Sequence, residues 1–279
     1  MKNLLIIGAA FVSTIKFIIK EHIEWRSQIL KLAKADIIKT YSGAALGWAW
    51  AIVKPTITIF VFWFAFSIGL RHGKDISGYP FVLWMMAGMV PWFYMSDMLT
   101  QGAGAIRKYK YLVTKMKFPV STIPTFVGLS KLFIHICLMV IVIAIFILTG
   151  HYPDIYYLQI PVYILFMVAF FIVWGLFSSM LSAMSSDFLN LVKALTTAIF
   201  WMSGILWDVN SIDIKWIQNV LYFNPVTYIA TGYRNVFIYK TWFWQEPKQL
   251  MIFAIVFVIM LILAIWSYKK LIKEIPDVL

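Results

Sequence analysis

A concentration of positively charged side chains lies in one basic segment, residues 102–125, which reads GAGAIRKYKYLVTKMKFPVSTIPT. It contains five cations and no acid, although only 13% of the whole chain is charged. A helix over residues 103–118 would carry an apolar stripe with cations beside it, ending near Phe118 and Pro119. The stripe would be Ile106, Tyr109, Val113 and Met116, and the cations are Arg107, Lys108, Lys110, Lys115 and Lys117. This pattern fits either a groove on a soluble partner protein or an anionic lipid surface.

No other group of residues predicts catalysis or metal binding. The segment GLRHGKD, which starts at Gly69, has one residue too few between its glycines for a phosphate-binding loop, and Asp75 replaces the magnesium-binding Ser or Thr. The histidines lack metal-ligand spacing, and we expect His135 to be a packing residue. Asp97 and Asp187 lie near predicted span ends, where we expect capping or solvated groups. We therefore expect no catalytic residue, no metal and no cofactor in this chain.

The elements that must position the basic segment are membrane-spanning helices. Apolar residues make up 62% of the 279-residue chain, compared with roughly 45–50% in soluble proteins. A bilayer core about 30 Å thick needs roughly 20 apolar residues per helix. We predict an all-α integral membrane protein whose six transmembrane helices span 48–70, 81–101, 126–149, 160–183, 188–206 and 249–268.

The distribution of cations predicts which side of the membrane each loop occupies. Segments 1–49, 102–125, 184–193 and 269–279 carry 16 Lys and Arg, whereas the loops that would face the other side carry 6. Cytoplasmic loops are richer in cations, so both termini and the tail 269–279 should be cytoplasmic. The net charge of +12 then reflects orientation, and we expect no nucleic-acid partner. We expect Lys54 and Lys131 to extend from span ends to the headgroups.

The N-terminal region, residues 1–47, is predicted to form amphipathic helices in the cytoplasmic interface. Apolar residues recur there at spacings of four or seven, at Ile15, Ile19, Ile23, Leu30, Ile37 and Tyr41. One possibility is that these helices serve as a membrane anchor and nothing more. The alternative is that Lys31, Lys34 and Lys39 attract an anionic lipid-linked substrate. The first residues resemble a signal peptide, but no clean cleavage site follows, so we expect them to be retained.

The long outer loop, residues 207–248, is nearly all apolar or aromatic. Asn224 and Pro225 divide it into two pieces that are each too short to span. We predict re-entrant or interfacial gate helices over 213–238, because irregular backbone at that depth must be satisfied by protein or water. Arg234 lies inside this segment and is a functional candidate, with a packed ion pair or a headgroup contact as the alternative.

Four features resemble one family of membrane proteins. They are ADIIKTYSGAALGWAWAIVKPTITIFVFWFAF, KYLVTKMKFPVSTIP, FNPVTYIATGYRNVFI and the six-span layout. Together they resemble permeases of the ABC-2 type, in the polysaccharide-exporter branch, and most closely those that export wall teichoic acid in Gram-positive bacteria. The resemblance covers residues from about Ala35 to Tyr268. Lys54 departs from the pattern, because a neutral polar residue is more usual before Pro55.

The resemblance implies a bacterial plasma-membrane complex of two copies of this chain with two copies of a separate ABC ATPase. That ATPase would bind the ATP and magnesium, and residues 103–118 would be the coupling helix that docks to it. Residues 213–238 would be gate helices at the outer face. The substrate would be a polymer on an undecaprenyl diphosphate carrier.

The resemblance also places spans one and five at the dimer axis. Trp48, Trp50, Trp63 and Trp201, with Lys54, are therefore candidates for the translocation path, where flat rings would let a sugar chain slide. The alternative for these tryptophans is ordinary helix packing. Export of another lipid-linked polysaccharide or of a small molecule fits the same features. From other classes, an ion-coupled carrier, a channel or a membrane scaffold would differ in needing no ATPase.

Overall fold

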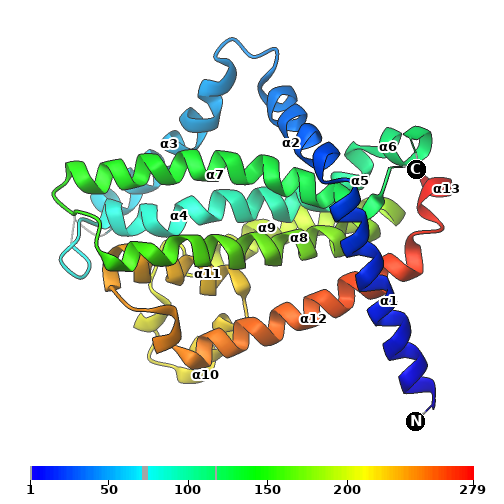
Figure 1. Ribbon diagram of the computed structural model, residues 1–279. Coiled ribbons are helices and arrows are strands. Elements are labelled where there is room, and N and C mark those ends of the chain that lie inside the picture. The colour runs from blue at the N-terminus through cyan, green and yellow to red at the C-terminus, as the bar shows by residue number, and fades with distance from the viewer. Residues whose placement is uncertain (1, 71–74, 117) are drawn as a thin grey trace.

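The computed structural model describes residues 2–70, 75–116 and 118–279, and within them the regular structure is helical (Figure 1). The predicted all-α class is confirmed. Lys117 of the basic segment and residues 71–74 of the GLRHGKD segment lie outside the described residues. The α-helices are α1 Lys2–Glu24, α2 Arg26–Tyr41, α3 Trp50–Trp63, α4 Phe81–Asp97, α5 Ala105–Lys108, α6 Lys110–Met116, α7 Ile123–Leu148, α8 Ile160–Met184, α9 Ser186–Met202, α10 Lys215–Tyr222, α11 Pro225–Arg234, α12 Pro247–Leu271 and α13 Ile275–Val278.

Several of these helices continue into other helical turns. π-helical turns extend α3 over Phe64–Leu70, α4 over Met98–Gly102 and α11 over Asn235–Tyr239. A 3₁₀ turn, Ile155–Gln159, precedes α8, and another, Val120–Thr122, precedes α7. These extensions make the helical segments long enough to match most of the predicted spans.

Four helical segments of the described chain are long and apolar enough to cross a membrane: Gly47–Gly69, Val120–Leu148, Ile155–Met184 and Pro247–Leu271. They contain α3, α7, α8 and α12, and they match four of the six predicted spans. The other two predictions, 81–101 and 188–206, correspond to α4 with its π turn and to α9, which are not among the four. The six-span count therefore stays a prediction.

Helix α4 is the centre of the bundle. It packs against α7, α11 and α3, and Leu83, Met85, Met89 and Met95 are fully buried. Because neighbouring helices cover most of α4, it does not need the uniformly apolar surface of a lipid-facing span. This explains why its sequence includes Pro91, polar tyrosine and Asp97 yet still forms a long central helix.

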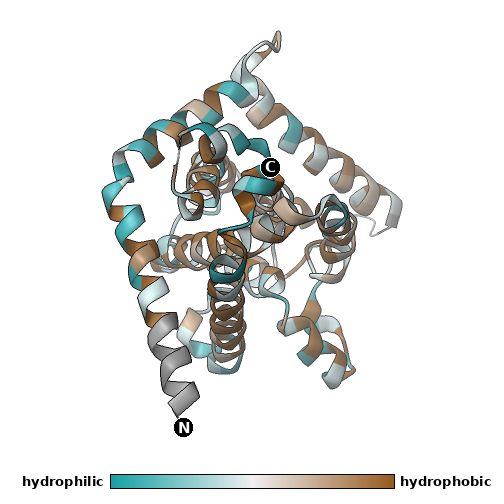
Figure 2. Cartoon of the chain, turned by 90° about the vertical axis from the view of Figure 1, so that its right-hand side faces the viewer, coloured by the Kyte–Doolittle hydropathy of each residue, from teal (hydrophilic) through white to brown (hydrophobic). Residues whose placement is uncertain are grey.

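Helices α1 and α2 lie along one end and one edge of the bundle (Figures 1 and 2). They are separate helices because the helical conformation of the backbone is interrupted at Trp25. The side of α2 that packs on α7 consists of Ile29, Ala33, Asp36 and Ile37. Ile19, Ile23 and Leu30 of the predicted apolar stripe are more than half exposed, so they do not pack in the bundle, and their contact with the membrane interface stays a prediction. The face of α2 that packs on α7 includes a buried acid, Asp36.

Helix α3 is the least covered of the four candidate spans. In its most apolar window only 6% of residues are buried, compared with 28–33% in the other three. The segment between α2 and α3 forms an apex that projects from the bundle (Figure 1). Helix α3 therefore presents most of its surface to whatever surrounds the chain.

Candidate functional site

The end of the bundle that holds α2, α5 and α6 is organised around Asp36. This carboxylate is 2% exposed and accepts hydrogen bonds from Lys108 at 2.7 Å, from Ser130 at 2.5 Å and from the Tyr109 hydroxyl. Burial raises the pKa of Asp36, but the hydrogen bonds from Lys108, Ser130 and Tyr109 and the Lys108 charge outweigh it, so the pKa lies below its ordinary value. Asp36 thus joins α2 and α7 to the α5–α6 segment.

Arg107 makes a second connection from this segment. Its guanidinium donates to the carbonyl of Ser182, and at 3.2 Å to that of Ala183. Both carbonyls belong to the last turn of α8, where helix carbonyls lack intrahelical partners and favour a cation. Arg107 and Lys108, which we expected to flank a free docking face, are therefore used to attach the segment to the bundle.

The predicted apolar stripe of the coupling helix is also used inside the chain. Ile106, Tyr109 and Val113 are 0%, 4% and 7% exposed, whereas Met116 is 63% exposed. The prediction of one continuous helix over 103–118 is wrong, because the chain turns at Tyr109 between α5 and α6. The turn brings the Tyr109 ring against Phe126, with centroids 4.8 Å apart. An apolar stripe predicts packing on the same chain as readily as packing on a partner.

The outward face of the segment carries other side chains. Lys110, Tyr111, Thr114, Lys115 and Met116 are exposed. At its end, Phe118 is buried with its ring 5.0 Å from that of Trp25, and Pro119 is half-buried. This basic face with one tyrosine and one methionine is the surface that a soluble partner could contact.

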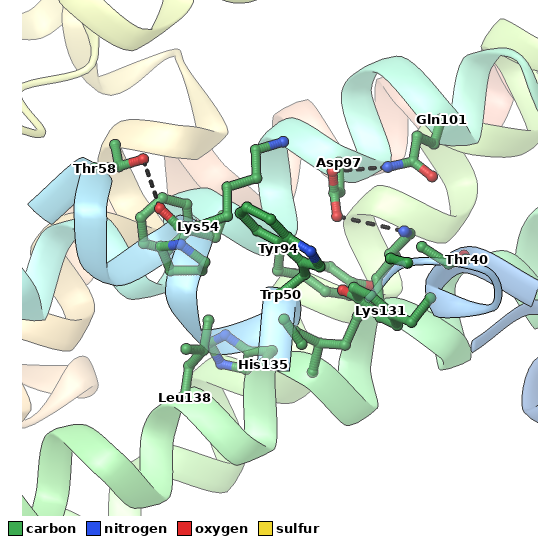
Figure 3. Close-up of a pocket in the computed structure, with 16 residues that line it drawn as sticks. Thr40, Trp50, Lys54, Thr58, Tyr94, Asp97, Gln101, Lys131, His135 and Leu138 are labelled. Atoms are coloured by element: carbon green, nitrogen blue, oxygen red, sulfur yellow. Dashed lines mark hydrogen bonds and ion pairs between the residues drawn. The ribbon is translucent and has the colours of Figure 1, made fainter. Parts of the chain in front are cut away.

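A cavity of about 340 Å³ opens beside α3 (Figure 3). Trp50 and Lys54 from α3, Asp97 and Gln101 from α4 and its π turn, and Lys131 from α7 contribute to its lining. Gln101 donates to Asp97 at 2.9 Å, and the Lys131 ammonium lies 3.5 Å from the other Asp97 oxygen. The structure thus brings together two of the path candidates, Trp50 and Lys54, with an ion pair.

One sequence expectation, for Lys131, is wrong at this cavity. Lys131 does not extend to the headgroups, because its side chain is 3% exposed and pairs with Asp97. Asp97 keeps 40% of its side chain exposed, which agrees with the expected solvated group, and it is also the partner of that lysine. Lys54 is exposed, as its snorkelling would require. The sequence signal for this ion pair was the presence of an acid, Asp97, in the predicted span 81–101 and of a lysine, Lys131, in the predicted span 126–149.

The tryptophans proposed for the path do not form one cluster. Trp48 lies in the 3₁₀ turn Gly47–Ala49 just before α3, Trp50 is the first residue of α3, and they are 46% and 42% exposed. Trp63 lies at the other end of α3 and is half-buried, and Trp201, which is 50% exposed, lies near the end of α9. Phe62 of α3 contacts Trp201 edge-on with centroids 6.3 Å apart. These rings are distributed along the uncovered side of α3 and α9.

Arg234 lies in a buried site at the opposite end of the bundle, where backbone carbonyls accept its hydrogen bonds. It is 2% exposed and donates to the carbonyls of Gly204, at 2.6 Å, and Ile205, just beyond the end of α9. Its guanidinium carbon lies 3.5 Å from the centroid of the Trp84 ring. A Cβ at Gly88 would come within 2.5 Å of the guanidinium, so glycine permits this approach. The headgroup-contact alternative does not fit such a buried residue.

Asn224 and Pro225 start the helix that carries Arg234. The Asn224 side chain accepts from the Val226 amide at 3.0 Å and donates to Ser203 at 2.7 Å. Pro225 is the first residue of α11, where its missing amide hydrogen has no cost. The cap therefore fixes α11 against the end of α9, the same region whose carbonyls bind Arg234.

Two further predicted positions have simple surroundings. Lys31, Lys34 and Lys39 are all exposed on α2. His135 is buried and shares a 2.8 Å hydrogen bond with the Tyr233 hydroxyl, which fits the expected packing role. Sequence reasoning missed Asp36, although an acid among the apolar positions Ile29, Ala33 and Ile37 was a signal for a buried polar contact.

Comparison with known proteins shows the family of this chain. The ABC-2 type transporter family matches residues 27–238, from α2 to the π turn after α11. This chain belongs to the ABC-2 type transporter family. It is also 25% identical over 221 residues to the O-antigen export system permease protein RfbA of Myxococcus xanthus, and the alignment covers 79% of this chain and 84% of that protein.

Membership of the ABC-2 type transporter family gives the chain its class. It is the membrane component of a transporter, as the resemblance predicted. The matched region contains the Asp36 connection, the cavity beside α3 and the Arg234 site. These three sites are therefore parts of the region that the family shares.

Proposed function

We propose that this ABC-2 type permease exports a lipid-linked polysaccharide from the cytoplasmic to the outer side of the bacterial plasma membrane, driven by a separate ABC ATPase. The observation that carries the proposal is the likeness to an O-antigen export permease over most of both chains. The family match over residues 27–238 supports the same class of transporter. Two permease copies and two ATPase copies would make the complex.

The α5–α6 segment is the proposed entry point of energy. Its outward residues, Lys110, Tyr111, Lys115 and Met116, would contact the ATPase. Arg107 attaches the segment to α8, and Lys108 and Tyr109 attach it to Asp36 of α2, by hydrogen bonds. The Tyr109 ring also packs on Phe126 of α7. Displacement of the segment by ATPase closure would therefore be passed to three helices together, as a rigid-body change between two packed arrangements.

The proposed orientation has six spans and both termini in the cytoplasm. Helices α4 and α9 would be the second and fifth spans, although α4 is enclosed by the other helices and α9 is short. The cation-rich segments α1, α2, α5 and α6 gather at one end of the bundle, which fits the positive-inside rule. Arg234, Asn224 and Pro225 would belong to gate helices at the outer end.

The polymer would need a route lined by protein, since unsatisfied hydroxyls and phosphates are costly in lipid. The uncovered side of α3 and α9, with Trp48, Trp50, Trp63 and Trp201, is the proposed lining once a second copy is present. Lys31, Lys34 and Lys39 on α2 would attract the anionic carrier at the membrane surface. Lys54 would stand near the inner mouth of this route.

The more specific proposal is that the cargo is wall teichoic acid on undecaprenyl diphosphate. It is supported by the segments ADIIKTYSGAALGWAWAIVKPTITIFVFWFAF, KYLVTKMKFPVSTIP and FNPVTYIATGYRNVFI. The O-antigen relative favours another lipid-linked polysaccharide as the second candidate. Export of a small molecule, or an ion-coupled carrier or channel, would follow only if no polymer accumulates when the chain is lost.

Depletion of the chain in its own cells tests the proposal. We expect lipid-linked polymer to accumulate inside the cells and to disappear from the surface, and re-expression of the chain should restore it. Chemical analysis of the accumulated material would distinguish polyol phosphate from other sugars. Normal surface polymer after full depletion would contradict the proposed function.

A further inference from the structure

We propose that the groove between α3 and α7 binds one anionic glycerophospholipid, with its phosphate between Lys54 and Lys131 and one acyl chain on each side. Three adjoining hollows, with α4 contributing to the floor, carry this inference. The site does not depend on the identity of the exported cargo. Its lining includes Trp48, Trp50, Trp63 and Lys54 of the proposed polymer route, so the bound lipid would form part of the wall of that route.

The three hollows share lining residues where they adjoin. The polar cavity of about 340 Å³ adjoins a hollow of about 240 Å³, with which it shares Pro55 and Leu138. It also adjoins a hollow of about 190 Å³, with which it shares Ala51 and Ile134. Helix α3 packs on α4 but leaves these spaces between itself and α7. Something must fill them in a membrane, because apolar walls without partner atoms lose their dispersion contacts.

The central cavity has the chemistry of a phosphate site. Lys54 and Lys131 contribute two cations and Asp97 one anion, so this part of the lining has an excess of one positive charge. The Lys131 ammonium has an ion-pair distance of 3.5 Å to Asp97, longer than the 2.7–2.9 Å of a charge-assisted hydrogen bond. A buried ammonium with donors to spare favours a further anionic acceptor. Lys54 reaches the same cavity from the exposed side (Figure 3).

The net charge also selects among headgroups. A phosphate diester with an uncharged polyol headgroup carries one negative charge and would balance the excess cation. Asp97, Gln101 and Thr40 also line the cavity and offer polar atoms to headgroup hydroxyls. A zwitterionic lipid would leave the excess cation unbalanced. The lining therefore favours a phosphatidylglycerol-like lipid.

The flanking hollows favour a lipid with two chains. One is lined by apolar residues of α3, α4 and α7 that include Ile59, Val82, Met86, Ile141 and Ile145. The other is lined by Trp48, Ile52, Phe133, Ile134 and Cys137 together with two alanines. A lipid with a single isoprenoid chain would fill only one of them. Two apolar branches that meet at one cationic cavity match the plan of a glycerophospholipid.

The test is binding of defined lipids to the purified, delipidated full-length chain in detergent, measured by native mass spectrometry and by the shift in melting temperature. We expect dioleoylphosphatidylglycerol to bind at least about tenfold more tightly than dioleoylphosphatidylethanolamine or undecaprenyl phosphate. Lys54→Gln, which removes one charge-assisted contact, should weaken phosphatidylglycerol binding about tenfold. Lys54→Arg should restore most of it.

Two further variants separate the groove from general lipid contact. Ile141→Trp should fill one apolar hollow and weaken binding without lowering the melting temperature of the lipid-free chain. Lys193→Gln removes an exposed lysine on α9 outside the groove and should leave binding unchanged. Equal binding of phosphatidylethanolamine, tighter binding of undecaprenyl phosphate, or equal effects of Lys54→Gln and Lys193→Gln would each overturn the proposal.

Discussion

At the scale of single residues, Arg234 shows how a cation is accommodated inside the bundle. Its flat guanidinium reaches two carbonyls beyond the end of α9 while stacking on Trp84. A lysine ammonium cannot reproduce this planar, forked geometry. We expect Arg234→Lys to lower the free energy of unfolding by about 2–4 kcal/mol, from lost hydrogen bonds to a buried charge. Thermal or denaturant unfolding in detergent measures it.

A matched exchange at the same end of the bundle is the control. Lys240 pairs with Asp154 at 2.8 Å in a partly exposed ion pair, so Lys240→Arg should change stability by less than about 0.5 kcal/mol. If Arg234→Lys were as mild as this control, the forked contact would not matter for stability.

Asp36 should make stability depend on pH. Its pKa is lowered in the folded protein from an ordinary value of 3.8, because the hydrogen bonds from its neighbours and the Lys108 charge outweigh burial. The contribution of Asp36 is therefore complete above about pH 4 and is lost as the pH falls through the lowered pKa. At pH 7, we expect Asp36→Asn to cost about 3 kcal/mol.

The measurement is the difference in unfolding free energy between wild type and Asp36→Asn from pH 7 down to pH 3. We expect a constant difference to about pH 4 and a decreasing one below it. A difference that does not change over this range would mean that the carboxylate charge is not what the network stabilises.

At the scale of elements, the α5–α6 segment has two faces with separate roles. Charge reversal on the outward face, Lys110→Glu with Lys115→Glu, should leave the melting temperature nearly unchanged and should reduce co-purification of the ATPase at least tenfold. Inward truncation, Ile106→Ala, should cost about 2–4 kcal/mol of stability, because it leaves a cavity in a packed region. Pull-down yield and melting temperature are the two measurements. Undiminished ATPase binding to the charge-reversed chain would show that the partner docks elsewhere.

The sequence could predict elements more reliably than the faces they bury. Length and composition were enough to place the helical segments that contain α3, α7, α8 and α12, and Asn224 and Pro225 marked where α11 begins. The inward turn of Tyr109 depends on Asp36, 73 positions away along the chain. The Lys131 pair likewise depends on how α4 and α7 pack. Such contacts between distant segments are set by tertiary packing, which periodicity within one segment does not contain.

At the scale of the whole molecule, the topology can be mapped with single cysteines. In a Cys137→Ser background, cysteines at Tyr152 and Asp213 should react with an impermeant thiol reagent in intact cells. A cysteine at Tyr111 should react only after the membrane is opened. A further cysteine at Asp75 tests α4. If α4 did not cross the membrane, the cysteines at Asp75 and Tyr111 would react with the reagent from the same side of the membrane. If α9 did not cross, Asp213 would report the cytoplasmic side.

In the proposed complex, ATP hydrolysis in a partner moves a lipid-linked polysaccharide through this permease. The most direct measurement is transport of lipid-linked polymer in proteoliposomes that contain the permease and its ATPase. We expect the polymer to reach the far side only with ATP and magnesium, and not when the ATPase carries a substituted phosphate-loop lysine. Transport driven by an ion gradient without ATP, or rapid ATP hydrolysis without any movement of polymer, would contradict ATP-driven export.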